Sequence, residues 1–94
     1  ASLILLNYHK SVLELTRDQL PKISPQDRDV SSLTLGISKE KIPDLKKHIQ
    51  HFRQQILKMV STDTSPDEVF LLNIQMIPVT KISTGDLTAH ENKN

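Results

Sequence analysis

The segment VSSLTLGISKEKIPDLKKHIQHFRQQILKMV, residues 30–60, contains the change in hydrophobic period on which the predicted fold depends. In residues 30–37, Leu33, Leu35 and Ile37 alternate with small or polar residues, which is typical of a half-buried β-strand. The remainder of the segment spaces its apolar side chains three and four positions apart, which is typical of an amphipathic helix. This apolar stripe consists of Ile42, Leu45, Ile49, Phe52, Ile56 and Met59. We therefore expect a strand followed by a long helix.

A helix before this segment and a strand after it complete the predicted fold. Residues 3–20 carry apolar side chains at helical spacing, and Pro21 ends the pattern. Residues 68–80 alternate like a strand until Pro78 interrupts them. The order α-β-α-β contains a βαβ unit, whose right-handed crossover makes the two strands parallel. We predict an α+β domain with a small sheet covered by two helices; antiparallel strands within an intertwined dimer are the competing topology.

The predicted sheet is too small to stand alone. Sheets normally have more than two strands, so the others must come from a second copy or from the rest of a longer chain. The 94 residues include no Trp, one Tyr and two Phe, so the core must consist mainly of Leu, Ile and Val side chains. We therefore expect a homodimer that completes the sheet, with the first helix packed across the interface. The predicted sheet core consists of Leu33, Leu35, Ile37, Phe70, Leu72, Ile74 and Met76. The predicted domain spans residues 1–80, followed by a disordered polar tail, residues 81–94.

Composition excludes several chemistries. The chain has no Cys and two Gly, so thiolate chemistry and glycine-rich phosphate loops are absent. His48 and His51 lie off the apolar stripe, which favours solvated surface histidines over a metal site, and no nucleophile motif is present. We predict a non-catalytic domain without metal or cofactor. No apolar run approaches the roughly 18 residues of a membrane span, and no signal peptide is recognisable, so we expect a cytoplasmic protein without a membrane partner. The initial Ala indicates a fragment of a longer protein.

Charge is unevenly distributed along a chain whose net charge is +1. Residues 39–60 hold six basic and two acidic side chains, a net charge of +4. One face of the predicted helix 39–60 carries basic side chains interleaved with Gln, and such a face can contact nucleic-acid phosphates. These basic side chains are Lys46, Lys47, Arg53 and Lys58. A solvated helix surface is the favoured alternative, because the whole chain is not strongly basic and shows no helix-turn-helix pair.

Three polar residues form a second candidate site. Asn73 and Gln75 lie on one face of an otherwise apolar predicted strand. They either form hydrogen bonds with a neighbouring element or, together with Arg28, line a small pocket for an effector molecule.

Three stretches and one residue pair carry a resemblance to a known family. They are Asn7-Tyr8-His9-Lys10, residues 27–35 (DRDVSSLTL), Phe52-Arg53 and residues 71–81 (LLNIQMIPVTK). Together they resemble the carboxy-terminal domain of unknown function in a paralogous family of bacterial helix-turn-helix transcriptional regulators. The resemblance covers residues 7–81.

The resemblance implies that a DNA-binding helix-turn-helix segment precedes this domain in the parent protein. We therefore expect a regulatory and dimerisation domain of a bacterial transcription regulator, with effector sensing as a further role. A direct nucleic-acid-binding module and a small-molecule sensor are the alternatives.

Overall fold

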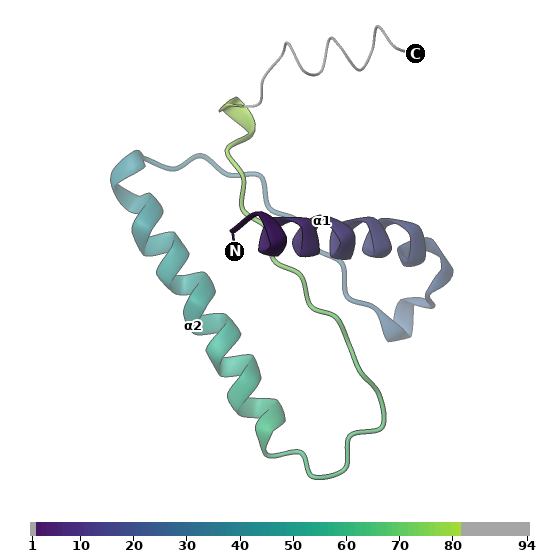
Figure 1. Ribbon diagram of the computed structural model, residues 1–94. Coiled ribbons are helices and arrows are strands. Elements are labelled where there is room, and N and C mark those ends of the chain that lie inside the picture. The colour runs from purple at the N-terminus through teal and green to yellow at the C-terminus, as the bar shows by residue number, and fades with distance from the viewer. Residues whose placement is uncertain (1, 82–94) are drawn as a thin grey trace, which may run out of the picture.

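The computed structural model describes residues 2–81 and places two α-helices among them (Figure 1). Helix α1 spans Ser2–Gln19 and helix α2 spans Ile42–Ser61. The remaining regular elements are single 3₁₀ turns at Leu20–Lys22, Pro25–Asp27, Lys39–Lys41 and Val79–Lys81. Two extended segments, residues 28–38 and 66–78, connect these elements. The predicted tail, residues 81–94, lies outside the described residues except for Lys81.

The predicted α+β fold is wrong. Residues 2–81 contain no β-strand, so there is neither a βαβ unit nor a sheet. Both alternating segments are extended, as their period requires, but no backbone hydrogen bond joins residues 28–38 to residues 66–78. Period-2 alternation fixes the direction in which side chains point, whereas a strand also needs a neighbour to bond with.

The side chains assigned to the sheet core are consequently exposed. Their exposed fractions run from 38% for Ile74 to 87% for Leu33, and Phe70 is 68% exposed. Extended chain with no neighbouring strand leaves both of its faces open to solvent, which accounts for these values.

Both predicted helices are present, and proline marks their boundaries. Pro21 follows the last residue of α1 by two positions and lies in the first 3₁₀ turn. Pro43 lies in the first turn of α2. Backbone N–H groups in this turn have no acceptor within the helix, so the helix loses no hydrogen bond through the missing N–H of proline. A separate tight turn, Lys39–Lys41, precedes α2, and the side chain of Ser38 forms no capping hydrogen bond there.

Residues 2–81 of a single copy form no hydrophobic core. No residue among those described is buried, and eight are half-buried: Val12, Thr16, Leu20, Ile42, Leu45, Ile49, Ile56 and Asn73. The accessible surface is 9369 Å² for a mass of 10.7 kDa, whereas a compact monomer of that mass exposes about 5,500 Å². The radius of gyration is 17.0 Å, against about 12 Å for a compact domain of this length.

Neither of the two helices has the length and apolar content that a membrane crossing requires, within the residues described.

Candidate functional site

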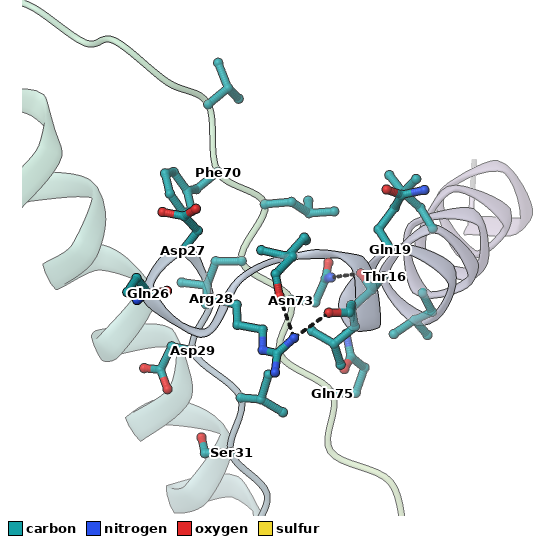
Figure 2. A pocket seen from close by; sticks show the side chains of 18 residues that line it. Thr16, Gln19, Gln26, Asp27, Arg28, Asp29, Ser31, Phe70, Asn73 and Gln75 are labelled. Atoms are coloured by element: carbon teal, nitrogen blue, oxygen red, sulfur yellow. Dashed lines mark hydrogen bonds between the residues drawn. The ribbon is translucent and has the colours of Figure 1, made fainter.

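An open hollow of about 870 Å³ lies where three parts of the chain meet (Figure 2). The C-terminal half of α1, the connection after it and the segment 66–78 supply its walls. Its polar lining consists of Thr16, Gln19, Gln26, Asp27, Arg28, Asp29, Ser31, Asn73 and Gln75. The three polar residues singled out by sequence, Arg28, Asn73 and Gln75, thus line one hollow although they come from two distant segments.

Arg28 closes the end of α1. Its Nη1 atom donates to the carbonyl oxygens of Leu20, at 2.8 Å, and Ile23, at 2.6 Å. The last turn of a helix leaves carbonyl groups without intrahelical partners and carries a partial negative charge, so a cationic donor is favourable there. Both acceptors lie just after Gln19, the last residue of α1, so Arg28 closes the turn that follows the helix.

Asn73 attaches the segment 66–78 to α1. Its Nδ2 atom donates to Thr16 Oγ1 at 2.8 Å, across 57 positions of sequence, and both residues are half-buried. Thr16 Oγ1 in turn donates to the carbonyl oxygen of Val12 at 2.8 Å. Gln75 lines the same hollow but has no hydrogen bond to the residues described. Asn73 thus has a structural partner on α1.

Thr16 is the site residue that sequence reasoning misses. A threonine inside a helix usually returns its hydroxyl to the carbonyl four residues earlier, as Thr16 does to Val12. While donating this bond, the hydroxyl oxygen of Thr16 can also accept a hydrogen bond from another side chain. The sequence around Thr16 does not indicate that Asn73 is the donor.

The Asn73–Thr16 hydrogen bond supplies a testable prediction. Replacing Asn73 by Ala removes the side chain that joins two distant segments and is expected to lower the free energy of unfolding by about 1 kcal/mol. Chemical denaturation followed by circular dichroism measures this change.

Gln75→Ala is the matched control, since Gln75 lines the same hollow without a hydrogen bond, and it should change stability by less than about 0.5 kcal/mol. In a double-mutant cycle with Thr16→Val, the two losses should be less than additive. Strict additivity would show that the bond is absent in solution.

The chemistry available in the hollow is that of polar recognition. Its guanidinium and amide groups donate hydrogen bonds, while the carboxylates of Asp27 and Asp29 accept them. One Asp27 oxygen already accepts from Ser24 Oγ at 2.9 Å. In the described part of the chain, no three His, Cys, Asp or Glu side chains gather in a way that holds a metal ion.

The basic residues lie away from this hollow, on α2. Lys46, Lys47, Arg53 and Lys58 are all exposed. Lys46 also borders a second, smaller hollow of about 260 Å³, where Ile49 and Gln50 of α2 approach Ile74 and Met76. The nearby His48 places its Nδ1 atom 2.9 Å from the carbonyl oxygen of Asp44, one turn earlier.

Comparison with known proteins identifies the family alone. Neither the curated proteins nor the solved structures include a significant match to this sequence. One family model, described as Domain of unknown function (DUF4423), matches residues 1–79, a region that contains both helices and every residue lining the two hollows. The chain therefore belongs to the family of domains of unknown function called DUF4423.

Proposed function

We propose that this chain is a non-catalytic assembly domain that pairs with a second copy of itself, within a bacterial transcription regulator. The observation that carries the proposal is the absence of any buried residue among residues 2–81. Burial of apolar surface is the main force that stabilises a folded chain, so a chain in which no apolar side chain is fully buried gains stability from a partner.

The area available for pairing is sufficient. The accessible surface of 9369 Å² exceeds that of a compact monomer by about 3,900 Å². Obligate homodimers bury about 2,000–5,000 Å² in total, so each copy contributes about 1,000–2,500 Å². The excess surface of one copy is therefore larger than the area that one copy contributes to such a dimer interface.

The N-terminal half of α1 is the proposed contact surface. Val12 and Thr16 mark the half-buried face of the helix, and Leu5 continues that face seven residues before Val12. Leu5 is 57% exposed, and the adjacent Leu6 and Tyr8 are similarly open. Soluble monomers rarely expose a continuous apolar surface of this kind. A second copy of α1 is the partner that the proposal assigns to it.

The part of the proposal that places this chain in a transcription regulator is supported by the family resemblance of residues 7–81. Regulators of that kind bind paired half-sites on DNA, and a dimerising domain fixes the distance between their two helix-turn-helix segments. In this proposal the parent protein contacts DNA through such a segment upstream, and the present domain brings two copies together.

The melting temperature tests this proposal, because folding that is coupled to pairing depends on protein concentration. A hundredfold increase in concentration is expected to raise the melting temperature by roughly 5–10 °C, since mass action adds about 2.7 kcal/mol for each dimer. A melting temperature that stays constant from 1 to 100 µM would exclude coupled pairing.

A small-molecule sensor is the second candidate, favoured by the meeting of Arg28 and Gln75 in one open hollow. An anionic or amide-containing effector bound there would raise the melting temperature. Unchanged melting in the presence of a panel of nucleotides, amino acids and carboxylic acids would remove this candidate.

A further inference from the structure

Helix α2 carries its four basic side chains on one side and its apolar stripe on another, with the exposed Leu57 lying among the basic residues. At 3.6 residues per turn, Lys46, Lys47, Arg53 and Lys58 fall within an arc of about 140°, which we call the basic face. The apolar stripe occupies a separate arc, and four of its members are half-buried: Ile42, Leu45, Ile49 and Ile56. The rest of the chain therefore covers part of the stripe, whereas all four basic side chains are exposed.

The surroundings of α2 are consistent with this exposure. The helix stands at one side of the fold, apart from α1 (Figure 1). The segment 66–78 approaches it near Ile49, where Ile74 and Met76 also border Lys46 and Gln50. Lys47, Arg53 and Lys58 are exposed and line neither of the two hollows.

The positive charge on the basic face is not neutralised. The one ion pair among residues 2–81 joins Arg17 and Asp18 of α1, at 3.5 Å, and none involves α2. The single acidic residue of α2 is Asp44, in its first turn. Four basic side chains against one acidic side chain leave α2 with a net charge of +3. Such a concentration of charge attracts a polyanion.

We propose that the basic face of α2 binds the phosphate backbone of a nucleic-acid duplex. Lys46 and Lys58 are twelve residues apart, which corresponds to about 18 Å along the helix axis. A duplex presents one phosphate charge for about every 1.7 Å of its axis, so several phosphates lie within reach of the four side chains. Gln50 and Gln54 lie between the basic residues and add uncharged donors for phosphate oxygens.

A lipid surface fits this helix less well than a nucleic acid does. An interfacial helix must bury its apolar face in the bilayer. In α2 that face is the one already turned toward the protein, as the half-burial of Leu45 and Ile49 shows. The proposal does not depend on self-association, since the basic face and the exposed part of α1 share no residue.

Fluorescence anisotropy of the full chain with labelled 20-base-pair duplexes, one of DNA and one of RNA, tests the proposal. Four phosphate contacts give a salt slope of about −3.6, so affinity should fall about 150-fold between 50 and 200 mM salt. The variant Arg53→Gln with Lys58→Gln keeps two contacts, and its affinity should fall only about 12-fold over the same range. The duplex that is bound more tightly identifies the source of the phosphates.

The matched control is Lys10→Gln with Lys22→Gln, which removes the same charge from α1 and the turn after it. Its salt dependence should equal that of the unmodified chain. The proposal is overturned if neither duplex binds at 50 mM salt, or if the control loses as much salt dependence as the α2 variant. Tighter binding to vesicles of phosphatidylserine and phosphatidylcholine than to either duplex would also overturn it.

Discussion

Replacing Leu5 by Glu is expected to weaken self-association about 100- to 10,000-fold. Leu5 is 57% exposed on the face of α1 that Val12 and Thr16 continue. Burial of one leucine side chain contributes about 1.5–3 kcal/mol. In a twofold-symmetric pair each substitution occurs twice, so the loss is about 3–6 kcal/mol for the dimer. Sedimentation velocity at several concentrations measures the change in the dissociation constant.

Leu3→Glu is the control for this substitution. Leu3 is also apolar and exposed, at 67%, but it lies on the opposite side of α1 from Leu5. It introduces the same charge into the same first turns of the helix, so effects on helix propensity are matched. The control should leave the dissociation constant within about threefold of the unmodified chain, since surface substitutions typically change free energies by about 0.5 kcal/mol. Equal effects of Leu3→Glu and Leu5→Glu would contradict the assigned contact face.

The second large effect is expected at Ile49, in the middle of the apolar stripe of α2. Its side chain is half-buried and borders the small hollow shared with Ile74 and Met76. Ile49→Asp removes the apolar side chain that lies beside Ile74 and Met76. The free energy of unfolding should fall by about 2 kcal/mol, which lowers the urea midpoint by roughly 1 M.

Gln54→Asp is the appropriate control for Ile49→Asp, because Gln54 lies on the outward side of the same helix. It introduces the same side chain without removing apolar contact, and its urea midpoint should stay close to that of the unmodified chain. If Gln54→Asp lowered the urea midpoint as much as Ile49→Asp does, the result would show that aspartate destabilises α2 itself. The stripe would then not be the packing face.

The helices were predictable because their signals are local. Residues 3–20 and the stripe from Ile42 to Met59 repeat with a helical period, and proline lies at a boundary of each helix. The tight turn before α2 follows from the position of Pro43, which belongs in the first helical turn. Sequence information over about one turn is enough for such features.

The strands were not predictable, because a strand depends on a neighbour that alternation does not specify. Leu33, Leu35 and Ile37 do lie in extended chain, but the segment has no bonding partner among residues 2–81. The βαβ interpretation supplied that partner from topology rules, which apply only once two strands pair. Alternation therefore predicted strands and a sheet that residues 2–81 do not form.

The candidate site was predictable in part, for the same reason. Asn73 and Gln75 stand out as polar residues in an apolar run, and Arg28 belongs to the stretch of residues 27–35 that carries the family resemblance. Their convergence on one hollow depends on Thr16, which accepts from Asn73 across 57 positions. Pairings over such distances have no local signature in a single sequence.

The solution mass of the chain, measured by sedimentation equilibrium from 1 to 200 µM, tests most directly the claim that the domain pairs with itself. The account predicts a mass that approaches twice 10.7 kDa as concentration rises, for the unmodified chain and for Leu3→Glu. It predicts that Leu5→Glu stays near 10.7 kDa over the same range. A mass of 10.7 kDa for the unmodified chain at every concentration would contradict the claim.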